Sequence, residues 1–195
     1  MQDPTATSPG FTLFDTAIGR CGVAWTARGI ARITLPETSD AAIRQRLARD
    51  TPGAAEADPP PAIAAAIERI TSHLGGTPAA LDELALDLDG VPEFHREVYA
   101  AARRIPSGQT VSYGALARSL GKPGAARAIG QAMGRNPFPV VVPCHRILAA
   151  NHAPGGFSAH GGVETKARLL AAEGFTLAIQ PELPFGAGTR PRGSR

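Results

Sequence analysis

The tetrapeptide Pro143-Cys144-His145-Arg146 directly follows the apolar run Val140-Val141-Val142 and carries one of only two cysteines in the chain. Only a thiolate is a strong nucleophile, so a reactive cysteine needs a base or a positive charge nearby, and the histidine and arginine of the motif offer both. Consecutive residues on a strand point to opposite faces, so His145 reaches Cys144 only if the chain turns at the proline. The alternative is that Cys144 is a small buried residue at the end of a core strand.

Length and composition predict a globular protein with one large or two small domains. Hydrophobic residues make up 43% of the 195 residues, without an apolar run near 18 residues, and the start, Met1-Gln2-Asp3-Pro4, lacks the pattern of a signal peptide. We therefore expect a soluble, cytoplasmic protein with no membrane contact. Cys21 and Cys144 have neither disulfide nor metal-ligand spacing, so we expect a packed Cys21, no metal and no cofactor.

Charge is unevenly distributed along the chain. Residues 1–90 contain 7 arginines and 12 acidic residues, whereas residues 91–195 contain 13 basic and 5 acidic residues. The second half is therefore the half suited to a polyanion. Most of the basic residues are arginines, whose planar guanidinium fits phosphate, although a coding bias toward arginine would give the same count without any function.

The first half predicts a small α/β scaffold domain over residues 11–90, after a flexible tail at residues 1–10. Short strands are expected at 11–15, 19–25 and 29–35, in an antiparallel meander with glycine-containing turns. Helices are expected at 40–49, after a cap at Ser39-Asp40, and at 61–74, where Gly75-Gly76 ends the apolar periodicity. The proline-rich stretch 51–61 predicts a loop, and 81–88 predicts a further strand. No residue of this half suggests chemistry.

The second half, residues 92–180, predicts a mainly helical domain beyond a boundary at Gly90-Val91-Pro92, followed by a flexible tail at 186–195. Helices are expected at 93–104, from the cap Ser112 through Leu120, at 125–133 and at about 163–172. Two short helices around a glycine-containing turn are typical of a helix-turn-helix, although plain helical hairpins are more common. Small residues on the second of these helices would let it lie close in a groove, with Arg127 projecting from it.

Five segments of this half resemble, in order and spacing, the O6-alkylguanine-DNA alkyltransferases, the methylated-DNA–protein-cysteine methyltransferases. These segments are Val111-Ser112-Tyr113, Ala125-Ala126-Arg127-Ala128-Ile129-Gly130, Arg135-Asn136-Pro137, Pro143-Cys144-His145-Arg146 and Leu169-Leu170-Ala171-Ala172-Glu173-Gly174. The resemblance covers residues 92–176 closely, and the first half only in the order of its strands and helices. It implies a ribonuclease H-like α/β N-terminal domain, with an antiparallel sheet and helices, and a winged-helix-like C-terminal domain.

The family's activity, implied here by resemblance, is direct DNA repair. The alkyl group of O6-alkylguanine, and also of O4-alkylthymine, would be transferred irreversibly to Cys144. Because the O6-alkyl group points into the duplex, the nucleotide must be flipped out, at a cost of roughly a few kcal/mol. The product is a thioether, so each molecule acts once. The implied partner is double-stranded DNA containing the lesion, bound by a monomer through the minor groove with little sequence specificity.

The resemblance also assigns catalytic roles. Cys144 is the nucleophile, and His145 is its base through a bridging water. Glu173 orients His145, and Asn136 braces the cysteine loop by hydrogen bonds to its backbone.

The DNA-binding and pocket residues follow from the same resemblance. Arg127 would enter the base stack and Tyr113 would assist rotation of the target nucleotide, with further DNA contacts from Ala126, Ala128, Gly130 and Arg135. The substrate pocket would comprise Tyr113, Met133, Val142, Pro143, Phe157, Ser158 and Ala159. Phe157 departs from the family, in which many members carry tyrosine; the ring can still stack on guanine, but the hydroxyl's hydrogen bond is lost.

Three other functions remain open at this point. A non-catalytic alkylation-damage sensor would share the fold, but in such proteins the cysteine is replaced. A helix-turn-helix regulator would bring a dimerisation helix, an effector domain or the cysteine-rich metal module of adaptive-response proteins, none of which the sequence indicates. An unrelated thiol hydrolase would give the basic half and Arg127 no role.

Overall fold

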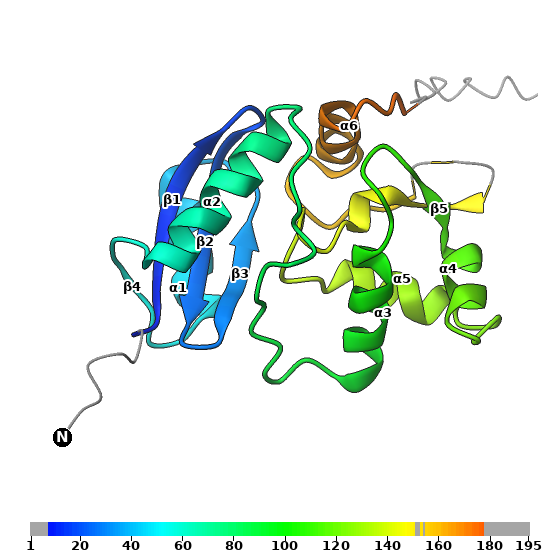
Figure 1. Ribbon diagram of the computed structural model, residues 1–195, viewed down its shortest axis with the longest axis horizontal. Coiled ribbons are helices and arrows are strands. Elements are labelled where there is room, and N and C mark those ends of the chain that lie inside the picture. Colours follow the sequence, from blue (N-terminus) through cyan, green and yellow to red (C-terminus); the bar gives the residue numbers. More distant parts are fainter. Residues whose placement is uncertain (1–7, 151–152, 154, 178–195) are drawn as a thin grey trace, which may run out of the picture.

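The computed structural model describes residues 8–150, 153 and 155–177. The tail expected at 186–195, and residues 1–7 of the tail expected at 1–10, lie outside these ranges. Within them the chain is mixed α/β, as the sequence predicts. A four-stranded sheet with two helices forms one half, called here the sheet half (residues 8–90), and the remaining helices form the helical half (residues 91–177) (Figure 1).

The sheet contains the predicted meander and one additional strand. Strands β1 (Gly10–Thr16), β2 (Gly19–Thr26) and β3 (Gly29–Thr34) pair antiparallel, and β4 (Ala55–Glu56) pairs with β1 in parallel, in the order β3-β2-β1-β4. The expectation of a plain loop at 51–61 is therefore wrong at β4. β1 starts inside the expected tail because Gly10 pairs with Trp25, and a Cβ on Gly10 would lie 2.6 Å from the Trp25 ring.

Helices α1 (Asp40–Asp50) and α2 (Pro61–Leu74) cover opposite faces of the sheet (Figure 1). Both spans agree with the sequence prediction to within a residue at each end. The side chain of Ser39 caps α1 by accepting a hydrogen bond from the Ala42 nitrogen at 3.2 Å, so one of the unpaired N–H groups of the first turn is satisfied. α1 packs closely on β2, where a Cβ on Gly22 would lie 2.6 Å from Leu47 Cδ1.

The strand predicted at 81–88 is wrong except for a single parallel bridge between Leu86 and Ile30. Arg103 holds the first part of this segment against the helical half. Its Nη2 atom donates to the carbonyl oxygens of Leu81 at 3.1 Å and Leu84 at 2.8 Å, and also to that of Asp82. The segment also turns here, because the Leu84 nitrogen donates to the Leu81 oxygen at 3.3 Å, so residues 82–84 are not extended.

The helical half contains α3 (Glu93–Arg103), α4 (Tyr113–Ser119), α5 (Ala126–Gly134) and α6 (Gly162–Ala172). All four were predicted to within one residue at each end. Ser112 caps α4, accepting from the Ala115 nitrogen at 3.1 Å. α4 and α5 pack against each other across their turn, and α3 packs on α5. A short parallel pair, β5 (Val111–Ser112) with β6 (Ile147–Leu148), was not predicted; it joins the start of α4 to the chain just after the cysteine motif.

The loop before Cys144 folds as turns rather than as a strand, so the strand-end alternative for Cys144 is wrong. The Val142 nitrogen donates to the Phe138 oxygen at 2.8 Å, and Val140 adopts a left-handed φ of 75°. This loop is attached to the sheet half, because the Ile33 nitrogen of β3 donates to the Pro137 oxygen at 2.9 Å. One continuous apolar core runs through both halves beneath it.

None of the helices within the described residues is both long and apolar enough to cross a membrane.

Candidate active site

Cys144 begins a single 3-10 turn, η1 (Cys144–Arg146), entered from Pro143 at φ −80° and ψ 67°. This is the change of direction that the sequence analysis required at the proline. The Cys144 side chain is buried, with 8% of the residue exposed. Burial raises the pKa of its thiol, while a hydrogen bond with Asn136 and the charge of Lys166 act in the opposite direction. A thiol with a raised pKa needs a base to become a nucleophile.

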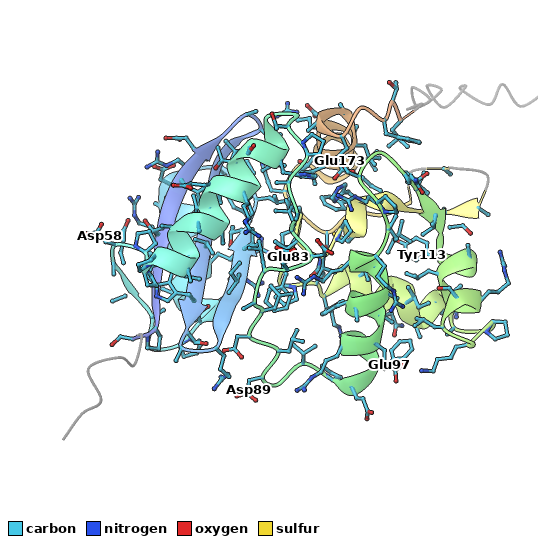
Figure 2. All side chains as sticks on the ribbon, in the orientation of Figure 1. Asp58, Glu83, Asp89, Glu97, Tyr113 and Glu173 are labelled. Carbon is cyan, nitrogen blue, oxygen red and sulfur yellow. The ribbon has the colours of Figure 1, made fainter. Side chains whose placement is uncertain are left out.

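Glu173, the C-cap residue of α6, accepts hydrogen bonds from three side chains. His145 Nε2 lies 2.8 Å and His73 Nε2 2.9 Å from its Oε1 atom, and Arg146 binds both carboxylate oxygens, with Nη2 2.7 Å from Oε1 and Nε 2.9 Å from Oε2. Figure 2 shows Glu173 where α6 ends, between the two halves. Burial opposes ionisation, but these hydrogen bonds hold the pKa of Glu173 well below its usual range. The carboxylate is therefore charged.

His145 is fully buried, and burial lowers the pKa of its imidazole while the hydrogen bond that it donates to Glu173 opposes that effect. Since an ionised carboxylate can only accept, Nε2 carries the hydrogen and Nδ1 of the neutral ring is an acceptor. Among the residues that the structure describes, Nδ1 has no hydrogen-bond partner. A neutral histidine with an available nitrogen is in the state that a general base requires.

Asn136, two residues after α5, holds the cysteine loop. Its side-chain nitrogen donates to the Val142 oxygen at 2.8 Å, and its side-chain oxygen accepts from the Phe138 nitrogen at 2.9 Å. The amide therefore bridges two backbone groups of the segment that leads into Pro143, so the loop cannot open without breaking both bonds.

A cavity of about 670 Å³ opens onto Cys144. This volume lies within the range of small-molecule sites and is large enough for a nucleobase. Its lining includes Tyr113, Arg127, Gly130, Met133, Phe157 and Ser158 from the sequence-predicted set, together with Gln131, Gly134, Ala149, Gly155 and Gly156. Ala159 lines a narrow crevice that reaches Cys144 from β3. Val142 and Pro143, both assigned to the pocket from the sequence, are buried behind the cysteine and line neither space.

The expected DNA contacts gather on α5 and at the start of α4. Arg127, Ala128 and Arg135 are exposed, and Ala126 and Gly130 are partly exposed. Arg127 also lines the cavity that reaches Cys144. Tyr113 is the first residue of α4 (Figure 2) and lines the same cavity. Burial raises the pKa of its phenol.

Comparison with known proteins identifies the family. Residues 93–175 match the family model described as 6-O-methylguanine DNA methyltransferase, DNA binding domain. The methylated-DNA–protein-cysteine methyltransferase of Methanothermobacter thermautotrophicus is 35% identical over 159 residues, which cover 82% of each chain. The protein belongs to the methylated-DNA–protein-cysteine methyltransferase family.

Two further methyltransferase relatives show how far the similarity extends. The Salmonella typhimurium protein of that name is 46% identical over 110 residues, which cover 56% of this chain and 63% of that relative, so the match spans less than two thirds of its length. A crystal structure of Mycobacterium tuberculosis OGT in complex with DNA superposes with a TM-score of 0.67 and 29% identity, covering 85% of this chain and 93% of that chain.

Three buried residues of this family member were not singled out from the sequence as parts of the site. Arg146 was noted only as a charge in the motif, but it binds both oxygens of Glu173. Lys166 lies on the buried face of α6, where its Nζ donates to the Ile147 oxygen at 2.6 Å, and burial lowers its pKa to about 8. His73 comes from α2. A lysine or histidine on an otherwise apolar helix face was the available signal for the last two.

Proposed function

We propose that the protein repairs DNA directly, by transferring the alkyl group of O6-alkylguanine, and also of O4-alkylthymine, irreversibly to Cys144. The observation that carries the proposal is the arrangement around the thiol. Cys144 lines a cavity large enough for a base, and the adjacent His145 is kept neutral by burial and oriented by an ionised Glu173. The names of the relatives, each a methylated-DNA–protein-cysteine methyltransferase, support the same activity.

In the proposed reaction His145 Nδ1 takes the thiol proton of Cys144 through a bridging water. The sulfur then attacks the alkyl carbon in line with the carbon–O6 bond. The sulfur–carbon bond forms, the carbon–O6 bond breaks, and its electron pair goes to the guanine, which takes up a proton to become unmodified guanine. Glu173 stabilises the imidazolium that forms on His145. The thioether has no second nucleophile to release it, so each molecule reacts once.

The proposed substrate is double-stranded DNA, bound by a monomer through the minor groove with little sequence specificity. The small residues Ala126, Ala128 and Gly130 would let α5 approach a groove closely, and Arg127, which is exposed on the same helix, would fill the space left by a flipped base. The DNA complex of the Mycobacterium tuberculosis relative supports DNA as the partner. The proposal includes the cytoplasm as location, because that compartment holds the DNA of the bacterial and archaeal relatives.

The proposed architecture is a ribonuclease H-like domain at 11–90 and a winged-helix-like domain at 92–180. The sheet order β3-β2-β1-β4, with only β4 parallel to its neighbour, supports the first assignment. The packing of α3 on the α4–α5 pair, beside the β5–β6 ladder, supports the second. Residues 178–180 of the second domain lie outside the described ranges.

The alternatives are less well supported. A damage sensor of this fold lacks the cysteine that Cys144 provides, and a thiol hydrolase gives the exposed Arg127 at the cavity no task.

Intact-mass measurement after incubation with an O6-methylguanine oligonucleotide tests the proposal. We expect one added methyl group per molecule, mapped to Cys144, and none in the Cys144→Ser variant. Cys21 provides an internal control, because burial raises the pKa of its thiol to about 11 and the cavity does not reach it. Methylation at Cys21, or an unchanged mass with the lesion still in the DNA, would refute the assignment.

A further inference from the structure

His73 lies in the last turn of α2, in the half that the sequence analysis treated as a scaffold without chemistry. Its side chain is 3% exposed, and its Nε2 atom lies 2.9 Å from Glu173 Oε1. The same carboxylate oxygen contacts His145 Nε2 at 2.8 Å and Arg146 Nη2 at 2.7 Å. His73, a residue of the sheet half, therefore contacts Glu173, the carboxylate that also contacts the proposed general base His145.

The chain around His73 gives this contact a structural basis. α2 ends directly after it, at Gly75-Gly76, and the end of α2 packs beside the end of α6, where Glu173 is the cap residue. A Cβ on Gly76 would lie 3.8 Å from the Ala172 oxygen, so the two helix ends approach closely enough for the side chains to meet. Backbone packing thus determines where His73 stands relative to the carboxylate.

We propose that His73 is a positioning residue for alkyl transfer: it donates a hydrogen bond to Glu173 and so fixes the carboxylate that orients His145. This inference rests on the proposed function and adds a residue from the sheet half to it.

The reason lies in how the carboxylate is held. Arg146 binds both oxygens and sets the plane of the group. Arg146 is itself held by the Ile105 oxygen, which accepts from its Nη1 atom at 2.5 Å, and Glu173 Oε2 also accepts from the Gly108 nitrogen at 3.4 Å. His73 approaches from a different element and contacts only Oε1, the oxygen that His145 uses. With this bond in place, Oε1 is held by residues of both α2 and η1. A movement of the carboxylate that lengthens the bond to His145 then also lengthens the bond to His73. Without the His73 bond, the described side-chain contacts of Oε1 come from η1 alone, and no such bond from another element opposes a lengthening of the His145 bond.

A purely structural role would make a different prediction. If His73 only joined α2 to α6, its removal would lower stability but would not depend on whether residue 173 carries a charge. If it acts through Glu173, its removal should matter little once Glu173 can no longer orient His145. A double-mutant cycle separates the two cases.

The test compares His73→Gln, which can present a side-chain N–H close to the original Nε2 position, with His73→Asn, which is one methylene too short to reach Glu173. The single-turnover rate at saturating O6-methylguanine DNA and the dissociation constant are measured for both, and the rate with free O6-benzylguanine is measured in parallel. We expect His73→Asn to lose about tenfold in rate on both substrates, as for the loss of one charge-assisted hydrogen bond, with unchanged DNA affinity. His73→Gln should retain most of the rate.

The cycle is completed in the Glu173→Gln background, where we expect His73→Asn to change the rate by less than about twofold. Ser72→Asn places the same side chain one position earlier, at an exposed site on α2, and should react like the wild type. His73→Leu, which leaves no unpaired polar group, replaces His73→Asn if the latter is unfolded in urea titrations.

Two outcomes would overturn the inference, provided that the wild type still methylates itself: wild-type rates in all His73 variants, or equal losses in both backgrounds. A wild type that gains no methyl group would instead refute the proposed function.

Discussion

Glu173 is the residue on which the electrostatics of the site depend. Its carboxylate is 1% exposed, is paired with the charge of Arg146 and lies within hydrogen-bond distance of two histidines. Buried ion pairs contribute little to net stability compared with apolar packing, but removing one partner leaves an unpaired buried charge that costs about 3–5 kcal/mol. The arrangement is therefore better explained by its effect on His145 than by a gain in stability.

At this residue we expect Glu173→Gln to slow transfer roughly 100-fold, the scale of a general-base contribution, and to raise the apparent pKa of the Cys144 thiol. The amide neither fixes the tautomer of His145 nor stabilises its cation. Single-turnover transfer measured across pH, with DNA binding in parallel, tests this, and binding should be nearly unchanged. Superimposable rate profiles would remove Glu173 from the mechanism.

Glu173 should also make the protein sensitive to acid. Because its pKa in the folded state lies below that of an unfolded glutamate, about 4.3, the unfolded chain takes up the proton first, and stability falls as the pH falls below that value. Above it the stabilisation is fully present. Urea midpoints between pH 7 and pH 3 should decline more steeply for the wild type than for Glu173→Gln, and parallel declines would argue against a depressed pKa.

Among the elements, α5 carries the surface proposed to meet DNA. Its buried side, with Ile129, Ala132 and Met133, packs into the core, and its other side exposes Arg127 among small residues. Tyr99 of α3 donates to the Ala132 oxygen at 3.1 Å and so fixes α5 from behind. The buried side of α5 is thereby fixed to α3, and its exposed side carries small side chains around Arg127.

For α5 we expect Arg127→Ala to reduce repair of duplex DNA by about tenfold or more and to leave reaction with free O6-benzylguanine almost unchanged. A residue that fills the vacated base stack has no task when no stack exists, and base extrusion costs a few kcal/mol. Second-order rates with both substrates decide this. Arg118→Ala on α4, at an exposed position that does not line the cavity, is the matched control. Equal losses on duplex and free base would assign Arg127 to the pocket or the fold.

For the whole molecule, the two halves share one core. The same apolar cluster includes Trp25 and Ile70 of the sheet half and Val98 and Leu169 of the helical half. Polar contacts cross between the halves as well, from Arg103 to the carbonyls of 81–84 and from His73 to Glu173. If one half unfolded, the apolar side chains that the other half contributes to this core would be exposed to water.

We therefore expect a single cooperative unfolding transition. Trp25 is the one tryptophan of the chain and lies in the sheet half, 2% exposed, so its fluorescence reports that half. Alkylation of Cys144, quantified by peptide mapping, reports the helical half. Coincident urea midpoints from the two probes are expected for a shared core. Separate midpoints would show that the halves unfold independently.

The helices and the meander could be predicted from the sequence because their determinants are local. Glycine-containing turns separate the strands, and Ser39 and Ser112 cap helices within three residues of themselves. The cysteine motif and its histidine were likewise visible as neighbours in the chain. Each of these features depends on interactions over a few residues, where periodicity and capping are informative.

What required the tertiary structure were the contacts between distant segments. His73 and Glu173 are 100 positions apart, and the guanidinium of Arg103 captures carbonyls near position 82 that an alternating pattern had assigned to a strand. Local patterns carry no information about which side chain from another element will reach a given carbonyl or carboxylate. These contacts are determined when the apolar faces of α2, α3 and α6 pack into the shared core. The environment of the Cys144 thiol depends on that packing.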